Sequence, residues 1–379
     1  MRDYPYACSV LRTRDQDACP GALQVHHAAD GALARVRVPG GMIGAAQLEA
    51  LASAATRFGS PAMELTSRGN IQIRGITDTA AVADAVAAAG LLPSATHERV
   101  RNIVASPMSG RVGEHADVRE SVRAVDAALQ ASPACAGLPA RFWFGIDDGR
   151  GDISGLGADV AVHVLGDSVA LLLAGRDTGV RLPMGDIVPT LIGVAARFAE
   201  LRENAWRVAE LIDTRPLLAD LTPVAPAGGS WPASARPPVG WIEQNDGRIA
   251  LGAAVPLGVL HADTARYLAA LGAPMVLTPW RSVLVFDLEE GVADVALRVL
   301  APLGLIFDEK SRWLNVSACT GSPGCAHAAA DVRADAVAWL GVAGPHRHFV
   351  GCERACGSPP IGEVLVASGE GYRTLRSHP

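Results

Sequence analysis

An internal duplication limits the folds that are open to this chain. Two pairs of segments resemble each other, 64–73 with 276–285 and 101–107 with 314–319. The first pair is offset by 212 residues (Thr66 and Thr278) and the second by 213 (Asn102 and Asn315). Two anchors at nearly the same offset indicate a domain that has been duplicated within one chain. We therefore expect two similar halves.

Each half has the periodicity of a small open α+β module. Alternating and helical spacings predict strand, helix, strand and helix, in that order, in the first half, and strand, helix and strand again in the second. The predicted ranges in the first half are 34–38, 48–58, 66–73 and 80–92, and those in the second half are 249–255, 262–271 and 275–286. Pro39-Gly40-Gly41 ends the first strand.

The regions outside these modules read as α/β structure. Residues 160–165 predict a strand with valines on one face, so that His163 on the other face is expected to be partly exposed. Further predictions are a strand at 168–173, a helix at 187–206, a helix at 328–340 and a strand at 364–367. Residues 222–240, rich in proline and glycine, are the expected linker.

Four cysteines near the C-terminus carry the strongest chemical signal. Five residues separate Cys319 from Cys325, and three separate Cys352 from Cys356. Each pair lies in a glycine-rich segment, which allows the backbone to approach an inorganic core and to direct N–H groups at sulfide. Four thiolates on two turns are the ligand set of a [4Fe–4S] cluster, because each corner iron needs one soft anionic ligand.

Two other uses of four cysteines are less consistent with this spacing. Zinc sites usually place paired cysteines two to four residues apart, which is shorter than the gap between Cys319 and Cys325. Disulfides need an oxidising compartment, and the first residues have no apolar core of a secretory signal. The remaining cysteines, Cys8, Cys19 and Cys135, are scattered, and we expect them to be small buried or free thiols.

Composition restricts the partners. The chain has 379 residues, enough for two or three domains, and 49% of them are hydrophobic without a run long enough to span a membrane. The formal charge of −6 gives no reason to expect nucleic acid. We therefore expect a soluble, cytoplasmic protein. Lys310 is the only lysine, so any anion pocket has to be built from arginine.

Several arginines flank the predicted strand ends of the duplicated segments. Arg68 and Arg101 lie beside glycine or asparagine, and Arg141 lies in a Leu-Pro-Ala-Arg segment. A single arginine is usually a solvated surface residue, but a group at strand ends that lead toward the cysteines suits a ligand rich in carboxylates. Arg35, Arg37 and Arg74 are further candidates on predicted strands, and Asn102 follows Arg101.

These motifs resemble the sirohaem sulfite and nitrite reductase superfamily over residues 18–367. The cysteine pattern is similar to its cluster motif, and its other blocks are similar to residues 34–41, 66–72 and 101–102. Within the superfamily, the chain is most similar to the precorrin-3B synthase branch of aerobic cobalamin synthesis. The segments that carry this similarity are 17–21, 97–102, 144–149, 277–281 and 351–354.

The resemblance implies an α+β fold with duplicated ferredoxin-like half-modules and two α/β domains, related by a pseudo-twofold axis and similar to the sulfite and nitrite reductases. We divide the chain accordingly into a first half-module (1–95), a first α/β domain (96–221), a linker (222–240), a second half-module (241–303) and a second α/β domain that holds the iron–sulfur cluster (304–379).

The resemblance also implies an activity. Precorrin-3A would be hydroxylated at C20 by molecular oxygen, a ring-A acetate would close a γ-lactone, and NADH would be the reductant, directly or through a reductase. The implied cofactors are a [4Fe–4S] cluster on the four cysteines and a mononuclear non-haem iron. Arg68, Arg101 and Arg141 take the catalytic anion positions, while Arg35, Arg37, Arg74 and Asn102 are the expected substrate ligands.

One departure separates the chain from the reductases of the superfamily. Sulfite reductases carry basic residues at two alternate positions after Leu-Pro-x, where this chain has Arg141 and Trp143. A tryptophan can neither bind a small anion nor supply protons to it. The ligands of a mononuclear iron stay open between two groups, His97 with Glu98 and Asp147 with Asp148.

Two alternative functions remain at this point. The first is a sirohaem-dependent nitrite or sulfite reductase, in which sirohaem would be bound. The second is a carrier that holds a tetrapyrrole or a cluster without catalysis. The chain has no Gly-x-Gly-x-x-Gly dinucleotide loop, so the sequence does not identify the direct electron donor. His327, His346 and His348 lie near the cysteines and are expected to pack or hydrogen-bond around the cluster.

Overall fold

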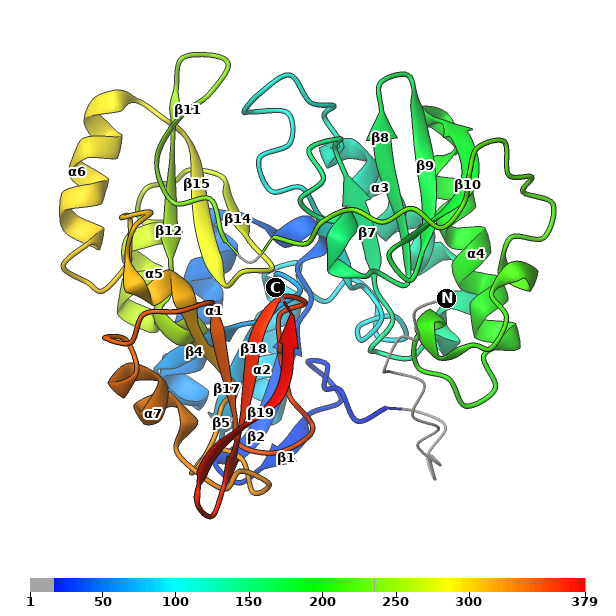
Figure 1. Cartoon of the computed structure of the whole chain (residues 1–379). Helices are drawn as coiled ribbons and strands as arrows, with labels where there is room; N and C mark the ends of the chain where they lie inside the picture. Colours follow the sequence, from blue (N-terminus) through cyan, green and yellow to red (C-terminus); the bar gives the residue numbers. More distant parts are fainter. Residues whose placement is uncertain (1–16, 235, 379) are drawn as a thin grey trace. The chain divides into compact units, whose positions relative to one another are not determined.

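A computed structural model describes residues 17–234 and 236–378 of the chain (Figure 1). The described residues fall into two units, each with its own internal contacts. The first unit contains 17–19, 94–110 and 114–233, and the second contains 20–93, 111–113, 234 and 236–378. Within these described residues, no helix is both long enough and apolar enough to cross a membrane.

The second unit contains two five-stranded sheets that are built in the same way. The order in the first sheet is β1 (His26–Ala28), β2 (Gly31–Val36), β5 (Ile71–Ile76), β4 (Ala62–Leu65) and β13 (Val259–His261). The order in the other is β11 (Gly240–Glu243), β12 (Ile249–Ala254), β15 (Ser282–Leu288), β14 (Met275–Leu277) and β3 (Met42–Ile43). Each sheet therefore takes its last strand from the opposite half, and this exchange is reciprocal.

The helices follow the same duplication. In the first half α1 (Ala45–Phe58) and α2 (Thr79–Ala88) alternate with the strands, and in the second half α5 (Ala262–Ala269) and α6 (Glu290–Leu300) do so. Helix α2 begins after Asp78, whose side chain accepts a 3.0 Å hydrogen bond from the N–H of Ala81 and so caps the first turn.

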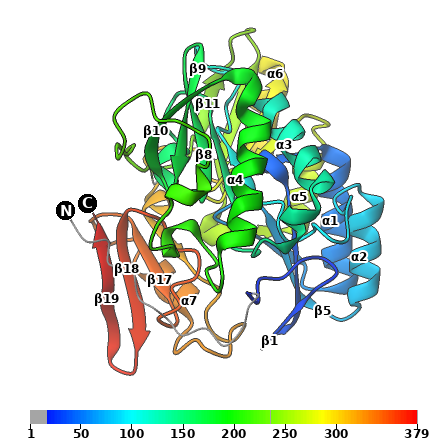
Figure 2. The same cartoon turned by 90° about the vertical axis from the view of Figure 1, so that its right-hand side faces the viewer.

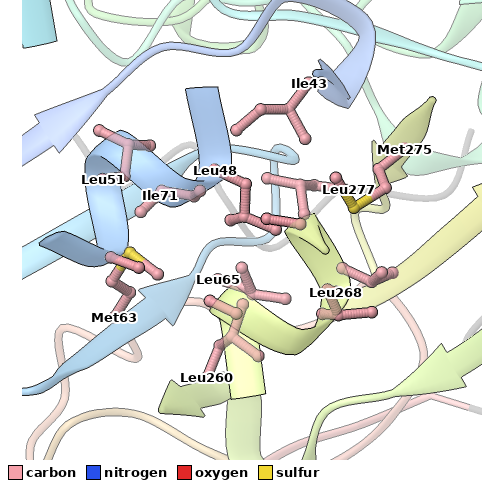
Figure 3. Close-up of a cluster of buried hydrophobic side chains, with 14 of the residues drawn as sticks. Ile43, Leu48, Leu51, Met63, Leu65, Ile71, Leu260, Leu268, Met275 and Leu277 are labelled. Carbon is pink, nitrogen blue, oxygen red and sulfur yellow. The ribbon is translucent and has the colours of Figure 1, made fainter. Parts of the chain in front are cut away.

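Buried aliphatic side chains from both halves form one core (Figure 3). Leu48 and Leu51 of α1 and Leu65 of β4 pack in the same cluster as Leu268 of α5 and Leu277 of β14. All five side chains are less than 5% exposed. The two halves therefore share a single hydrophobic core, and neither buries its apolar face alone.

The turns that join the paired strands in each half confirm the duplication in detail. The N–H of Thr66 donates to the carbonyl of Asn70 at 2.9 Å, and the N–H of Thr278 donates to the carbonyl of Ser282 at the same distance. Each threonine hydroxyl also accepts two backbone N–H groups in its own turn. Segment 275–286, predicted as one strand, is therefore a hairpin of β14 and β15, and 66–70 is a turn before β5.

A mixed sheet organises the first unit. Its order is β10 (Arg176–Pro183), β9 (Ser168–Leu173), β8 (Val160–Leu165), β7 (Phe144–Asp147) and β6 (Ile103–Ala105). Strands β6, β7 and β8 are parallel, whereas β9 pairs antiparallel with both β8 and β10. Helices α3 (Arg119–Ala131) and α4 (Ile187–Leu201) pack against each other and against this sheet (Figure 2).

The C-terminal segment of the second unit forms a similar, smaller sheet. Its order is β16 (Val316–Ala318), β17 (Arg347–Val350), β18 (Gly362–Ser368) and β19 (Gly371–His378), which lie side by side in orange and red (Figure 1). The first two pairings are parallel and the third is antiparallel. Helix α7 (Val332–Ala338) packs against β16 and β17.

The α+β class and the duplication are confirmed, and several local predictions need correction. The helices predicted to end at Leu92 and Trp206 end four and five residues earlier, at Ala88 and Leu201, because the periodic apolar residues continue into loops. The helix predicted over 328–340 is shorter at both ends and spans Val332–Ala338. His163 is buried, 4% exposed, because the face of β8 that carries it is covered by Trp231, whose ring centroid lies 4.4 Å from the imidazole centroid.

Candidate metal centre

Both cysteine pairs lie at one edge of the C-terminal sheet. Cys319 directly follows β16, and Cys352 follows β17 by one intervening residue. Because β16 and β17 are adjacent and parallel, their carboxyl ends meet at the same edge of the sheet. The loop 319–325 and the loop 352–356 therefore start next to each other.

Backbone N–H groups point at the sulfur of Cys319. The N–H of Gly351 donates to Cys319 Sγ with an N···S distance of 3.4 Å, and the N–H of Gly321 donates to the same sulfur. Burial raises the pKa of the Cys319 thiol, and the neighbouring sulfurs of Cys325 and Cys352 raise it further. The sulfurs of Cys325 and Cys352 are thus within electrostatic reach of Cys319.

Two glycines allow this close approach. A Cβ atom on Gly351 would lie 2.4 Å from Cβ of Ala328, and one on Gly321 would lie 2.8 Å from Cγ2 of Val332. Gly321 also has a φ of +71°, which L side chains rarely adopt. A larger residue at either position would clash with the segment that follows the first cysteine loop, at Ala328 or Val332.

The donor set fits an iron–sulfur cluster. Cys319, Cys325 and Cys352 are partly buried, Cys356 is exposed, and none of the four is in a disulfide. Soft thiolates supported by N–H groups aimed at sulfur are the ligand environment of such clusters. Of the scattered cysteines, Cys135 is a buried free thiol as predicted, Cys19 is partly buried and free, and Cys8 lies outside the described residues.

Arg74 fastens the first cysteine loop to the half-module sheet. Its guanidinium makes two 2.9 Å hydrogen bonds to the carboxylate of Asp30 and donates a third, of 2.7 Å, to the carbonyl of Gly324. Gly324 immediately precedes Cys325. The bidentate pair with Asp30 orients the guanidinium toward this carbonyl.

Glu64 makes a second connection between the half-module and the cysteine segment. It is 8% exposed and accepts hydrogen bonds from Gln72 at 2.8 Å and from Arg333 of α7 at 2.6 Å. The hydroxyl of Thr320, next to Cys319, also donates to it at 3.4 Å. A buried carboxylate needs such partners, and here they come from both segments.

A chain of hydrogen bonds connects two histidines and a serine to the backbone of the second cysteine pair. His348 Nε2 is 3.0 Å from the carbonyl oxygen of Cys356, which can only accept, so Nε2 carries the proton. His348 Nδ1 then accepts from the hydroxyl of Ser317 at 2.7 Å, and Ser317 Oγ accepts from Nε2 of His346 at 3.3 Å. This assignment leaves His346 Nδ1 as a buried acceptor without a described partner.

Both of these histidines are neutral near pH 7. Burial, and then the charge of Arg281, lower the pKa of His346 to about 4. The same two causes, burial first, place the pKa of His348 well below its usual value. Neutral imidazoles allow the directed chain of hydrogen bonds that ends at Cys356.

The arginines predicted to bind anions are divided between the two units. In the second unit Arg68 is partly buried in the turn between β4 and β5, and Arg35 donates to the side-chain oxygen of Gln72 through Nε at 2.9 Å. Arg37 is 1% exposed and donates to the carbonyl of Pro20 at 3.1 Å. The structure therefore brings Arg35, through Gln72, into the same network as Glu64.

In the first unit, the predicted site residues contact protein groups. Arg101 makes a bidentate pair with Asp126, with N···O distances of 2.7 and 2.8 Å. The amide of Asn102 donates to the carbonyls of Ala140 and Phe142. The exposed Arg141 holds its guanidinium 5.2 Å from the ring centroid of Trp206. The catalytic and substrate-binding roles of all seven of these predicted residues stay predictions.

The two groups considered for a mononuclear iron also form hydrogen bonds within the protein. Asp147 accepts hydrogen bonds from four backbone N–H groups, those of Gly149, Gly151, Ile153 and Ser154. Both ring nitrogens of His97 are hydrogen-bonded, Nε2 to the carbonyl of Ser132 at 3.0 Å and Nδ1 to neighbouring hydroxyls. Asp147, Asp148 and Asp152 approach within 4.8 Å of one another, but Arg150 pairs with Asp148 at 2.9 Å. The ligands of a mononuclear iron stay a prediction.

Comparison with known proteins confirms the resemblance. Residues 26–89 match the family described as nitrite/sulfite reductase ferredoxin-like half domain. The chain is 29% identical to a precorrin-3B synthase of a Sinorhizobium species, over 98% of this chain and 87% of the relative. It is 27% identical to a ferredoxin–nitrite reductase of Synechococcus elongatus, over 88% of this chain and 75% of that enzyme.

A solved structure supports the fold. The NirA protein of Mycobacterium tuberculosis aligns with 92% of this chain and 77% of its own, with a TM-score of 0.73 and 19% identity. The predicted fold, with duplicated ferredoxin-like half-modules and α/β domains similar to those of the sulfite and nitrite reductases, is therefore confirmed. The domain boundaries proposed from the sequence stay predictions.

Proposed function

We propose that this protein is an oxygen-dependent precorrin-3B synthase, an oxidoreductase that hydroxylates precorrin-3A at C20 and closes a γ-lactone. The observation that carries the proposal is the end-to-end similarity to a precorrin-3B synthase, which extends over 98% of this chain and 87% of the relative. Precorrin-3B synthases and nitrite reductases are both oxidoreductases, so the choice between these two activities depends on the residues of the site.

Trp143 favours the synthase over a reductase. It takes a position at which sulfite reductases carry a basic residue, is 6% exposed, and donates its backbone N–H to Asp159 at 3.0 Å. An indole ring offers no charge to a bound sulfite or nitrite. A pocket for a small anion would lack one of its cations, whereas a large substrate with many carboxylates does not depend on that position.

The proposed reaction balances with one oxygen molecule and two electrons. One oxygen atom enters the substrate as the C20 hydroxyl group, and the acetate carboxylate forms a C–O bond to the adjacent ring carbon as the C20 double bond is lost. The second oxygen atom leaves as water, with two electrons that come from NADH, either directly or through a reductase. When bound, an iron–sulfur cluster supplies electrons one at a time.

The chain's own residues have two tasks in this scheme. The four cysteines and the N–H groups of Gly321 and Gly351 hold the cluster next to the half-modules. Arginines would bind the substrate's carboxylates, because guanidinium forks match carboxylate geometry and only one lysine is present. Arg68, partly buried in its turn, is the candidate for the first such contact. Rigid placement of the macrocycle would keep C20 within about 3–3.5 Å of the oxidant.

The test is a reconstituted reaction with a defined substrate. Protein purified without oxygen is analysed for iron and labile sulfide, and precorrin-3A is then added with isotopically labelled O₂ and a reductant. We expect one labelled oxygen atom in the product by mass spectrometry. Arg68→Ala should reduce turnover and substrate binding, whereas Arg298→Gln on the exposed face of α6 should not. Undiminished binding and turnover by Arg68→Ala would remove Arg68 from the proposed site.

The alternative is a sirohaem-dependent nitrite or sulfite reductase, which the 27% identity to a ferredoxin–nitrite reductase favours. The visible spectrum distinguishes the two functions, because sirohaem has strong bands that an iron–sulfur cluster lacks. Bound sirohaem together with nitrite or sulfite consumption would replace the proposed function by this one.

A further inference from the structure

Arg281 occupies a backbone position that its duplicated counterpart gives to glycine. Arg281 has a φ of +58°, and Gly69 in the equivalent turn has a φ of +65°. Both donate their N–H to the carbonyl of the turn threonine, Gly69 to Thr66 at 3.2 Å and Arg281 to Thr278 at 3.1 Å. Residues with a Cβ are strained in this region, so an arginine persists there only where the surroundings hold it.

The surrounding backbone leaves room for this side chain. A Cβ atom on Gly258 would lie 2.6 Å from Cδ of Arg281, and one on Gly357 would lie 2.5 Å from its Nη2. The same Nη2 donates to the carbonyl of Gly357 at 2.7 Å. Gly357 directly follows Cys356. The absence of a side chain at Gly258 and at Gly357 therefore leaves the space in which the guanidinium contacts the second cysteine loop.

The guanidinium has no carboxylate of its own among the described residues. Burial lowers the pKa of Arg281 to about 10, so it is still a cation at neutral pH. Glu64 and the Cys319 thiol are the groups that favour its charge, and Arg333 opposes it. Glu64 is already hydrogen-bonded to Arg333 at 2.6 Å and to Gln72 at 2.8 Å. The side chain of Arg281 is half-buried, and a nearby anion stabilises a cation that is partly removed from water.

The two histidines near the second cysteine pair form hydrogen bonds. His348 donates from Nε2 to the carbonyl of Cys356 at 3.0 Å and accepts from the hydroxyl of Ser317 at Nδ1, an arrangement that only a neutral imidazole allows. His346 donates to Ser317 at 3.3 Å. Of these two histidines and Arg281, only Arg281 brings a positive charge toward the cysteines. Besides Glu64, the anions near Arg281 are then the sulfur ligands, which become thiolates when they bind metal.

We propose that Arg281 is the counter-cation of the iron–sulfur cluster and raises its reduction potential. The inference rests on the proposed use of the four cysteines as cluster ligands. Reduction adds a negative charge to the cluster, and a fixed cation in a partly desolvated position stabilises the reduced form more than the oxidised form. The strained backbone and the two glycines place that cation at the second cysteine loop.

Reductive titration of the loaded full-length protein, followed by electron paramagnetic resonance, tests this role. Arg281→Met removes the charge and keeps the stem, whereas Arg281→Lys keeps the charge. We expect the ratio of reduced to oxidised cluster at a fixed solution potential to fall at least tenfold in Arg281→Met, which is about 59 mV for one electron. Arg281→Lys and the control Arg298→Gln should stay close to the wild type.

Thermal unfolding of the metal-free proteins shows whether Arg281 stabilises the fold itself or the bound cluster. Without the cluster the charge of Arg281 lacks its anion, so metal-free Arg281→Met should melt no lower than the metal-free wild type. A stable Arg281→Met protein that no longer retains iron and sulfide would support the proposal. A lower melting temperature of metal-free Arg281→Met, or an unchanged potential in its loaded form, would overturn it. Wild-type protein without labile sulfide would instead refute the proposed cofactor itself.

Discussion

The carboxyl edges of the two parallel strand pairs, β6 with β7 and β16 with β17, start from the same geometry. Ser106 follows β6 and donates its N–H to Ile146 of β7 at 3.1 Å, and Cys319 follows β16 and donates to Phe349 of β17 at 2.9 Å. Each side chain then accepts an N–H from the opposite loop, Ser106 from Asp148 at 3.1 Å and Cys319 from Gly351 at 3.4 Å. Ser106 and Cys319 are also separated by 213 residues, the offset of the duplication.

The two edges differ in the side chains that their loops carry. In the first unit Asp147 accepts four backbone N–H groups and organises its own loop. Although burial opposes it, hydrogen bonds from His163, Ser154 and Gly151 hold the pKa of Asp147 below its usual range. In the second unit the equivalent loops present cysteine sulfurs and glycines. Hydrogen bonds within the protein therefore occupy the polar groups of the first edge, whereas the second edge carries soft sulfur donors that suit a metal.

Loss of a cysteine should have the largest effect on this contrast. Cys319→Ser keeps an acceptor for the N–H of Gly351 but removes a soft ligand, so iron and labile sulfide should fall to background levels after anaerobic reconstitution. Cys19→Ser, which changes a partly buried free cysteine of the first unit, is the matched control and should retain the wild-type content. Full cluster content in Cys319→Ser would exclude Cys319 as a ligand.

Removal of the organising carboxylate should destabilise the first edge. Asp147→Ala leaves several buried N–H groups without an acceptor, and we expect a loss of about 3 kcal/mol or more in the free energy of unfolding. Urea unfolding measures it, with Asp167→Asn in the exposed turn between β8 and β9 as control. A change of less than about 1 kcal/mol would mean that water replaces these contacts readily.

The first edge should also respond to pH through Asp152. Burial raises the pKa of Asp152 to about 7, and the charges of Asp147 and Asp148 raise it further, while the hydroxyl of Ser106 opposes the shift. A raised pKa stabilises the fold at low pH, and this contribution is lost between the ordinary carboxyl pKa, about 4, and about 7. Asp152→Asn should remove that loss.

The measurement compares unfolding free energies of wild type and Asp152→Asn at pH values on both sides of this window. We expect the variant to gain about 2 kcal/mol relative to the wild type as the pH rises through it. Equal pH slopes for the two proteins would show that Asp152 ionises normally. A titration of this kind is not expected at the second edge, where the equivalent loop carries no such carboxylate cluster among the described residues.

The sequence predicted those features of the two edges that depend on residues close together in the chain. Cysteine spacing and glycines identify the second edge because ligands of one cluster lie on two short loops. Glu64 and Arg333 were missed, since their contact joins residues 269 apart and no local pattern relates them. Arg281 was missed because the arginine of the first turn, Arg68, corresponds to Trp280 in the second turn, and Arg281 itself corresponds to Gly69. The backbone angles show that Arg281 adopts the positive φ of that glycine, which the sequence alone does not reveal.

His163 shows a second limit of sequence patterns. Strict alternation assigned it to the face opposite the valines of β8, but alternation does not say whether that face is covered. Trp231, 68 residues further along the chain, covers it, and the imidazole Nδ1 contacts the hydroxyl of Ser154 at 2.9 Å. Trp231 lies in the segment predicted as a linker, which has no periodic pattern that would indicate packing against a strand.

The smallest expected effect comes from exchanging the residue that distinguishes the two edges. Ser106→Cys introduces at the first edge the residue found at the second, with a sulfur that can still accept the N–H of Asp148. The variant loses the 2.6 Å hydrogen bond that the serine hydroxyl donates to Asp152, so we expect a loss of about 1 kcal/mol in the free energy of unfolding. Iron content should not rise, because a single thiol beside a loop closed by Asp147 offers no site for a cluster. A Ser106→Cys protein that bound additional iron and sulfide would show instead that the first edge remains open to metal, and that the carboxylates do not exclude it.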